Sequence, residues 1–405
     1  MSPDDSDGSP AAPVPGGEVE EPAEEPALVP MIVAAAAAIV TMAGVLFAAI
    51  SQAGGAAEPQ RAGPEREQRA ATNDGAKGDR RGPSQVAPAC LDGRARPGRI
   101  ERRPAVAVKV ENAPAARPQS GLEHADVVFE EIVEGGITRF MAIFHCGEAG
   151  EVGPVRSARL DDARIAKSFT RLLAYSGSNK PVMRELAASG MRRIDEGRGG
   201  PAFYRLPPGS SDVYSLFAST EILRRRFTSG LPAPAGEVLR RADLFRRAKV
   251  ARRVSLTFSA ANPIEYRYAD GLWARSEGGA PFVTASGGPI AVPNLLIQRV
   301  RVDRSETVVD VAGNPSPELD LDGGGPALLF RSRAGPGTGG RVVKGSWRFD
   351  KKGLLRYARR GGEPLPFAGG PVWVELLPFK REGDVRGTLA YRPAPGGSRR
   401  STEGR

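Results

Sequence analysis

The sequence predicts an α+β protein: a mixed α/β N-terminal domain, then a β-rich antiparallel C-terminal domain, both after one N-terminal transmembrane helix. Three features of the 405 residues predict this fold. An uncharged stretch near the N-terminus is long enough to cross a bilayer. Helical and strand-like patterns are mixed in the middle of the chain. Short β-rich runs then recur about every 8–12 residues, separated by Gly, Pro, Asn and Asp.

The first 98 residues divide into three segments of different composition. Residues 1–27 are rich in Pro, Glu and Asp, and they predict a disordered acidic tail in the cytoplasm. Residues 28–50 contain no charged side chain, and at 1.5 Å per residue they can span a bilayer as one helix. Residues 51–98 are rich in Gly, Ala, Pro and Arg and predict a flexible linker. Together they predict a single-pass membrane anchor.

The first folded block is predicted over residues 99–235. Val106, Val108 and Val110 alternate with smaller or charged residues, which is the period of a strand. Capping residues and closing glycines also mark helices in this block. Further strands are predicted over 126–133 and 139–146, and helices from Ser157 through Leu173, over 180–189 and over 220–227.

The second folded block, residues 245–380, is predicted to be an antiparallel sheet. Its apolar runs are short, and turn residues separate them at regular intervals. Residues 386–405, which end in PGGSRRSTEGR, predict a disordered tail. The predicted strands are 254–259, 264–268, 272–276, 295–302, 307–311, 327–330, 341–349, 354–357 and 372–377.

The counts of cysteine and histidine limit the chemistry. Two Cys and two His residues exclude an iron–sulfur protein and a Cys-ligated zinc ribbon, and they make a multi-His metal site improbable. His145 and Cys146 are adjacent in a predicted strand, so their side chains point to opposite faces and cannot form a catalytic pair. No phosphate-binding P-loop or G-x-S-x-G motif occurs. We therefore expect no metal and no cofactor.

The charge of the chain is unevenly distributed. The whole chain carries +10 and residues 1–50 alone carry −8, so residues 51–405 carry +18. A body this basic is typical of proteins that meet nucleic acid, anionic lipid or an acidic polymer, although solvated surface arginine is the simpler explanation. Aromatic residues, the platforms for stacking bases, make up only 6% of the chain. We therefore expect an anionic partner other than nucleic acid.

A group of charged side chains is the best candidate site. Arginines beside the free N–H groups of a helix N-terminus can bind an anion. Carboxylates beside them could serve as acid and base in an enzyme, or could simply pair with the arginines in a structural network. The carboxylate candidates are Glu130 and Glu134, and the arginine side of the group comprises Arg139, Arg156, Ser157 and Arg159.

The same residues lie in motifs that resemble the YerB-like family of bacterial lipoproteins. The resemblance covers about residues 90–380 and implies a two-domain extracytoplasmic protein. It implies no reaction, because that family has no known function. The motifs are ARPQSGL (116–122), EGGITRF (134–140), GPVRSAR (153–159), NLLIQ (294–298) and, near the end, GSWRF (345–349) with GGPVWVELLP (369–378).

The resemblance also carries expectations for single residues. It implies that the body lies outside the cytoplasm, where Cys90 and Cys146 would pair as a disulfide. Arg117, Gln119 and Ser120 would line the same region as the arginines. The chain departs from the family twice: a transmembrane helix replaces the lipidated cysteine, and SDVY (211–214) stands where relatives carry an H-N-x-Y motif.

These observations favour a membrane-anchored cell-envelope protein that binds an anionic wall polymer or a similar ligand. Two alternatives stay open at this point. One is an envelope hydrolase or transferase that uses Glu130 or Glu134, with arginines holding the substrate. The other is a structural partner of a second envelope protein.

Overall fold

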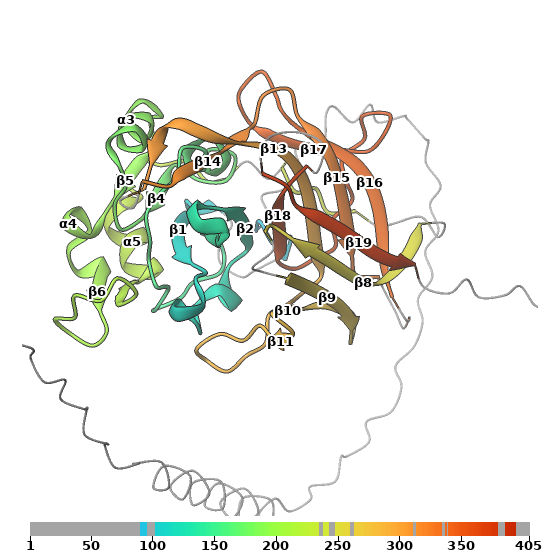
Figure 1. Ribbon diagram of the computed structural model, residues 1–405, viewed down its shortest axis with the longest axis horizontal. Helices are drawn as coiled ribbons and strands as arrows, with labels where there is room; N and C mark the ends of the chain where they lie inside the picture. Colours follow the sequence, from blue (N-terminus) through green and yellow to red (C-terminus); the bar gives the residue numbers. More distant parts are fainter. Residues whose placement is uncertain are drawn as a thin grey trace, which may run out of the picture. The chain divides into compact units, whose positions relative to one another are not determined.

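The computed structural model describes residues 90–94, 102–234, 238–242, 248–259, 263–310, 313–333, 337, 339–379 and 385–393 (Figure 1). The predicted cytoplasmic tail, the predicted transmembrane helix over 28–50 and most of the predicted linker lie outside these residues. In the part of the chain that is described, none of the helices combines the length and the apolar composition needed to cross a bilayer.

One mixed sheet begins in the first half of the chain, which is coloured teal to green in Figure 1. Strand β3 lies between β1 and β2 and is antiparallel to both, whereas β4 and β5 continue the sheet in parallel from the other edge of β1. Every residue of β1, β2 and β3 is buried, as expected where both faces of a sheet are covered. The bounds are β1 Val106–Glu111, β2 Val127–Ile132, β3 Thr138–Phe144, β4 Leu172–Ala174 and β5 Arg192–Ile194.

Short helices accompany these strands. The Asn179 side chain caps α3, and the Ser219 side chain caps α5, so both predicted helices at these positions are confirmed. A small hairpin of β6 and β7 follows α4. The bounds are α2 Asp162–Ala166, α3 Lys180–Ala188, α4 Glu196–Gly199, α5 Thr220–Phe227, η2 Pro114–Ala116, η3 Leu122–His124, η4 Glu134–Gly136, η5 Gly200–Ala202, β6 Phe203–Arg205 and β7 Leu216–Ala218.

The helix predicted from Ser157 through Leu173 is wrong. Helix α2 is only five residues long and begins at Asp162, while Leu172 and Leu173 belong to β4. The apolar spacing there fits a helix, but pairing of β4 with β1 buries these leucines completely. Tertiary packing therefore overrides the local pattern.

The second half of the chain, yellow to red in Figure 1, consists of strands. Most pairs are antiparallel, as predicted, but β18 is parallel to β13, so the sheet is mixed. Strand β14 was missed because two prolines interrupt its pattern. The bounds are β8 Lys249–Thr257, β9 Pro263–Ala269, β10 Leu272–Glu277, β11 Ala280–Pro281, β12 Ala291–Val292, β13 Asn294–Val309, β14 Pro315–Asp320, β15 Gly325–Arg331, β16 Gly340–Phe349, β17 Leu355–Ala358, β18 Val372–Pro378 and β19 Thr388–Pro393.

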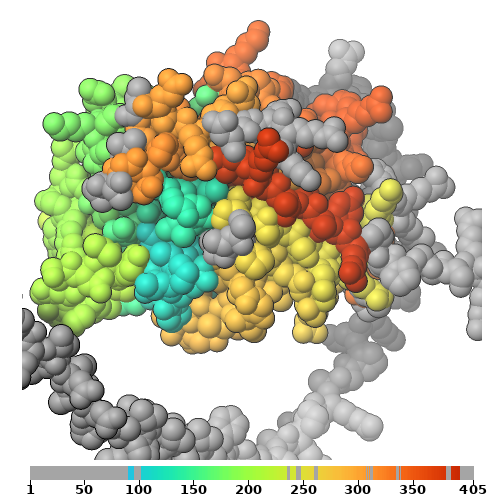
Figure 2. All heavy atoms as spheres, viewed as in Figure 1, coloured from blue at the N-terminus to red at the C-terminus, as the bar shows by residue number. Residues whose placement is uncertain are grey.

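Two predicted boundaries of unstructured segments are corrected. The tail predicted to be disordered from residue 386 contains β19, which pairs antiparallel with β8 and lies along it in Figure 2. The linker predicted to extend to residue 98 already contains folded chain at Cys90, Leu91 and Asp92, all of which are buried. Contacts with residues far away in sequence order both segments, and such contacts cannot be predicted from local composition.

The two predicted blocks share this sheet. Strand β18 of the second half runs parallel to β2 of the first half, with Val372 opposite Val127 and Glu375 opposite Glu130. The sheet continues from β18 through β13, β15, β16 and β8 to β9 and β10. Side chains of β10 return to contact β2 and β18, as described below.

The start of α2 is joined to β14 through one carboxylate. Asp161 accepts a hydrogen bond from the Leu319 N–H at 2.9 Å. Burial raises the pKa of Asp161 from 3.8 to about 8, and the nearby charges of Glu131, Asp162 and Glu318 add to this effect. The protonated form is therefore the one that suits the folded chain.

We expect Asp161→Asn to make the protein less sensitive to alkaline pH. The folded-state pKa lies above the unfolded one, so the stability due to Asp161 is greatest below about pH 4 and is lost as the pH rises through about 8. The variant keeps an oxygen for Leu319 and should be the more stable protein at pH 9, by roughly 2–4 kcal/mol. Urea unfolding from pH 4 to 9 measures this, and parallel curves for the two proteins would contradict it.

Candidate functional site

Two arginines meet one carboxylate at the carboxyl end of β1. Glu111 is the last residue of this strand. Its Oε2 lies 2.9 Å from Arg139 Nη2 and 2.8 Å from Arg156 Nε. Arg139 also donates to the Ser157 carbonyl oxygen at 3.1 Å. Strand β1, strand β3 and the segment before α2 therefore converge on Glu111.

A third arginine joins this group through a second carboxylate. Arg159 Nη2 pairs with Glu134, which lies in η4, and Arg159 Nη1 donates to the Ala158 carbonyl at 3.0 Å. The Ser316 hydroxyl donates to the other oxygen of Glu134. Burial raises the pKa of Glu134, but Arg159 and these hydrogen bonds outweigh it, so this pKa lies below its ordinary value. Glu134 is therefore an ionised, fully engaged carboxylate.

The cluster of Arg139, Arg156 and Arg159, which we call the arginine cluster, has two carboxylates in direct ion-pair contact, Glu111 and Glu134. Burial lowers the pKa of Arg139, and the positive charges of Arg159 and Arg156 lower it further, while Glu111 opposes this. Burial raises the pKa of Glu111, yet Arg139 and Arg156 bring it below its ordinary value. The three guanidinium groups repel one another, and an added anion would relieve that repulsion.

The three arginines differ in their access to solvent. The Arg139 side chain is 4% exposed, that of Arg159 is 14% exposed and that of Arg156 is 25% exposed. Arg156 lies under the ring of Tyr214, with 5.6 Å from its Cζ to the ring centroid, and it donates to the Val213 carbonyl at 3.4 Å. Both partners belong to SDVY, the motif that departs from the family. Arg156 is thus the member of the cluster that a ligand reaches most easily.

The backbone around the arginine cluster also suits a ligand. Strands β1 and β4 are parallel, and ligands of α/β sheets bind beyond the carboxyl ends of such strands. The loop that leaves β4 is held to the cluster by the Ser176 N–H, which donates to the Arg156 carbonyl at 3.0 Å. The Ser178 hydroxyl donates to the Ala158 carbonyl at 2.8 Å. The arginine cluster and the start of α3 therefore both lie beyond the carboxyl ends of β1 and β4.

The other predicted ligand residues, Arg117, Gln119 and Ser120, are engaged in contacts within the protein. Arg117 pairs with Glu277 of β10 and donates to the Asn112 carbonyl at 2.9 Å. Gln119 is buried, and its amide donates to the Glu111 carbonyl at 3.0 Å. The Ser120 hydroxyl donates to Glu151 at 2.7 Å. In these contacts the three side chains bind the protein itself.

Sequence reasoning missed a buried ionic cluster centred on Arg275 of β10. The guanidinium group of Arg275 lies 2.8 Å from Glu130, 2.8 Å from Glu277 and 3.1 Å from Glu375. It also lies 4.8–5.7 Å from the centroids of four aromatic rings. Those rings belong to Phe140, Tyr266, Phe282 and Trp373. Arg275 thus ties β10 to β2 and β18.

One carboxyl in this cluster, that of Glu375, favours its neutral form. Burial raises the pKa of Glu375 well above its ordinary value, and the charge of Glu130 adds to this, although Arg275 opposes it. The Tyr266 hydroxyl donates to Glu375, and Glu375 is also hydrogen-bonded to Glu130. With Glu375 neutral, the charges of Arg275 and Arg117 balance those of Glu130 and Glu277. The cluster is therefore a closed and neutral unit.

The two candidate catalytic carboxylates lie in separate networks. Glu130 is fully buried in the Arg275 cluster, where a substrate has no access to it. Glu134 pairs with Arg159, and its lowered pKa makes it a poor general acid. Glu131, on the opposite face of β2 from Glu130, pairs with the buried Lys109. In the described residues, no group of three or more His, Cys, Asp or Glu is arranged to hold a metal.

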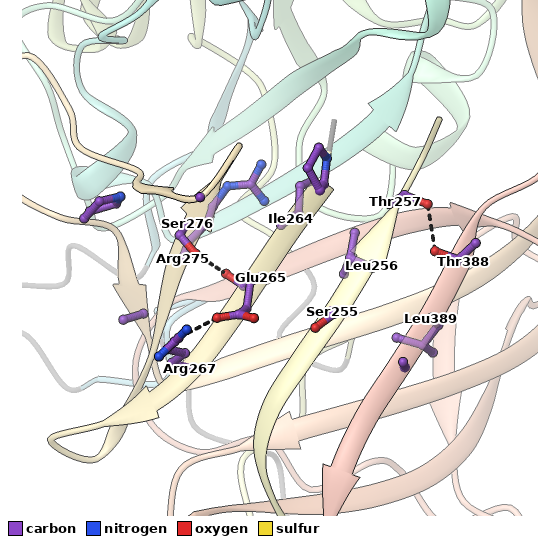
Figure 3. A pocket seen from close by; sticks show the side chains of 15 residues that line it. Ser255, Leu256, Thr257, Ile264, Glu265, Arg267, Arg275, Ser276, Thr388 and Leu389 are labelled. Carbon is purple, nitrogen blue, oxygen red and sulfur yellow. Dashed lines mark hydrogen bonds and ion pairs between the residues drawn. The ribbon is translucent and has the colours of Figure 1, made fainter. Parts of the chain in front are cut away.

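A groove of about 700 Å³ lies on the outer face of β19, β8, β9 and β10 (Figure 3). Figure 3 shows Ser255 and Thr257 on β8 and Ser276 on β10, with the Thr257 hydroxyl 2.7 Å from that of Thr388 on β19. Glu265 pairs with Arg267 at one end. Small side chains and a neutralised ion pair give this groove little attraction for an anion, in contrast to the arginine cluster.

Cys90 and Cys146 form a disulfide beside the first strands. The Leu91 N–H donates to Nδ1 of the buried His145 at 3.1 Å, so the chain that enters the fold is held at two adjacent points. Arg241 also donates to the Leu91 and Ala368 carbonyls. The disulfide therefore fastens the first described residues to the end of β3, and Arg241 links them to the segment before β18.

Comparisons with known proteins agree with this architecture. Two family profiles match, "Protein of unknown function (DUF3048) N-terminal domain" over residues 91–230 and the DUF3048 C-terminal domain over residues 254–374. The "Putative lipoprotein YerB" of Bacillus subtilis (strain 168) is 31% identical over 291 residues, which cover 69% of this chain and 82% of that protein. The chain belongs to the YerB-like family.

A solved structure extends the YerB-like assignment to the fold. The crystal structure of the YerB protein from Bacillus subtilis matches with a TM-score of 0.61 at 25% identity, over 75% of this chain and all of that one. Both YerB-like segments contribute to the sheet through β2 and β18. The family thus accounts for the described fold, while its description leaves the function open.

Proposed function

We propose that this YerB-like protein is a membrane-anchored, extracytoplasmic envelope protein that binds an anionic envelope ligand at the arginine cluster. Arg156 and Arg159 would contact the ligand, with Tyr214 beside them. Arg139 would hold Glu111 and the Ser157 carbonyl in place. A wall polymer that carries phosphate or carboxylate groups is the ligand class that fits these side chains.

The crowding of guanidinium groups in the arginine cluster supports this proposal. Burial lowers the pKa of Arg139, the charges of Arg159 and Arg156 lower it further, and two carboxylates pair directly with the three guanidinium groups. Arg156 has solvent-exposed surface beside an aromatic ring, which is a common setting for recognising a planar or tetrahedral anion. The net charge of +18 on residues 51–405 would also attract a polyanion over longer distances.

The proposed location has three supports. The relative from Bacillus subtilis is named a putative lipoprotein, a class of protein attached to a membrane. This chain has the uncharged segment Leu28–Ile50 near the start of its sequence. An oxidising exterior also favours the Cys90–Cys146 disulfide.

Arg156→Gln should weaken binding of the full chain to poly(glycerol phosphate) about tenfold or more, because one exposed charge-assisted contact is lost. Glu111 keeps Arg139 as a partner, so the fold should be preserved. Binding of the detergent-purified protein to the immobilised polymer, measured from 50 to 300 mM salt, tests this. Weaker salt dependence should accompany the weaker binding.

The matched control is Arg226→Gln, which removes the same charge from an exposed position on α5. It should bind the polymer as the native chain does. Equal losses in the two variants would show that only net charge matters, and an unaffected Arg156 variant would remove the arginine cluster from consideration.

A further inference from the structure

We propose that a cavity of about 200 Å³ beside the Glu134–Gly136 turn is a second anion site, which takes one compact phosphate or carboxylate group between Arg304 and Arg386. Four segments line it: the η4 turn, the end of β8, the β13–β14 hairpin and the residues before β19. These segments are far apart in sequence and come together only in the fold. In Figure 2 their colours, teal, yellow, orange and red, adjoin near the middle of the face.

Two arginines give this cavity its charge. Arg304 and Arg386 both line it and are exposed, and no carboxylate among the described residues lies within ion-pair distance of either. By contrast, Arg301 of β13 has Asp303 as an ion-pair partner at 2.9 Å, and Arg356 of β17 has Asp350 at 2.8 Å. A pair of guanidinium groups without a carboxylate is suited to bind an anion from outside.

The carboxylate in the wall does not cancel this charge. Glu134 lines the cavity, but one of its oxygens pairs with Arg159 and the other accepts the Ser316 hydroxyl. Arg159 therefore balances Glu134, and among the described residues no carboxylate pairs with Arg304 or Arg386. Glu134 thus separates the arginine cluster from this cavity.

The turn leaves room for a ligand close to the backbone. Gly135 and Gly136 have φ of +72° and +75°, values that L-residues rarely adopt. A Cβ on Gly135 would meet no atom within 4 Å, so the space beside it is open. Without a side chain there, an anion can approach the main chain of the turn.

The size of the cavity selects the ligand. Pockets for drug-sized molecules hold roughly 300–1,000 Å³, so 200 Å³ suits a single phosphate, a carboxylate or a short phosphoester. The group could be a free ion or one unit of a polymer, since both present the same charged oxygens. The site should therefore recognise one phosphate or carboxylate group whose oxygens accept hydrogen bonds from both arginines.

The experiment measures inorganic phosphate binding by calorimetry, with the full chain in detergent. All proteins in this experiment carry Arg156→Gln, so the arginine cluster contributes little to the measured binding. The result for the cavity is therefore independent of whether the arginine cluster binds a ligand. The parent should bind one phosphate saturably, with a dissociation constant of about 1 mM or below. Adding Arg304→Gln and Arg386→Gln should weaken binding at least tenfold, whereas the control pair Arg226→Gln and Arg252→Gln should leave it unchanged.

A second pair of variants tests the position of the site. Gly135→Asp puts a carboxylate beside the two arginines and should abolish phosphate binding, whereas Gly135→Asn has the same shape without the charge and should preserve it. Asn and Asp both tolerate positive φ better than other residues. Competition by poly(glycerol phosphate) would identify a polymer-borne group, and competition only by glycerol 3-phosphate would identify a small ligand. Absence of saturable binding in the parent, or native binding in the Arg304/Arg386 variant, would overturn the proposal.

Discussion

Arg275→Leu should lower the free energy of unfolding by about 3–5 kcal/mol, because it leaves buried carboxylates without a cation. Arg275 is fully buried and pairs with Glu130, Glu277 and Glu375, which come from three strands. The substitution removes the positive charge while keeping an apolar side chain beside the aromatic rings. Urea unfolding of the full chain at pH 7, followed by tryptophan fluorescence, measures the loss.

Glu375→Gln is the matched control for this prediction. Burial raises the pKa of Glu375 well above the ordinary value, so a neutral amide replaces a carboxyl whose neutral form the fold favours. The amide needs no proton on folding, so the variant should be at least as stable as the native chain at pH 7. Since the folded-state pKa of Glu375 is above the unfolded one, the native chain should lose stability relative to this variant as the pH rises toward that pKa.

The outcome that would contradict the Arg275 cluster is specific. If Arg275→Leu costs less than about 1 kcal/mol, the carboxylates do not depend on the arginine, and β10 is held by its apolar contacts alone. If Glu375→Gln is as damaging as Arg275→Leu at pH 7, Glu375 is ionised and the proposed balance of charges is incorrect.

Removing the disulfide should lower the free energy of unfolding by about 4 kcal/mol, the chain-entropy value for a loop of this length. Cys90 and Cys146 are 56 residues apart in sequence, and the bridge closes the segment that contains β1, β2 and β3. Cys90→Ser combined with Cys146→Ala should show the full loss in thermal or urea unfolding. Reductant should destabilise the native chain and leave the double variant unchanged.

Mass spectrometry checks the bond itself. The native chain, alkylated in denaturant without reductant, should show no free thiol, since it contains only these two cysteines. Two alkylated cysteines would show that the pair is reduced in the isolated protein. An intact bond with no effect of reductant on stability would show that Leu91, His145 and Arg241 hold the entering chain without it.

Much of the secondary structure could be predicted from local pattern. The alternation at Val106, Val108 and Val110 gave β1, and the capping residues Asn179 and Ser219 with their apolar faces gave α3 and α5. Strand β19 could not be predicted in this way, because its sequence is short and follows a charged segment. Its order comes from pairing with β8, more than a hundred residues away in sequence.

The candidate site was predictable in part. The arginines were found because three of them lie in motifs close to one another in the sequence. Glu111, their main partner, was missed although it follows the alternating valines, because a carboxylate at a strand end is unremarkable by itself. Glu134 was singled out, but nothing local shows that Ser316 and Arg304 lie beside it.

The sequence by itself determined the family, the basic body, the main strands and the arginine-rich motifs, because these depend on composition and on neighbours within a few residues. Only the tertiary structure decided which charges are compensated. Arg139 and Arg275 are both buried arginines, yet burial and two neighbouring arginines lower the pKa of Arg139, whereas nearby carboxylates outweigh burial and raise the pKa of Arg275. The difference comes from carboxylates that approach from distant strands, since electrostatic balance depends on distance in space.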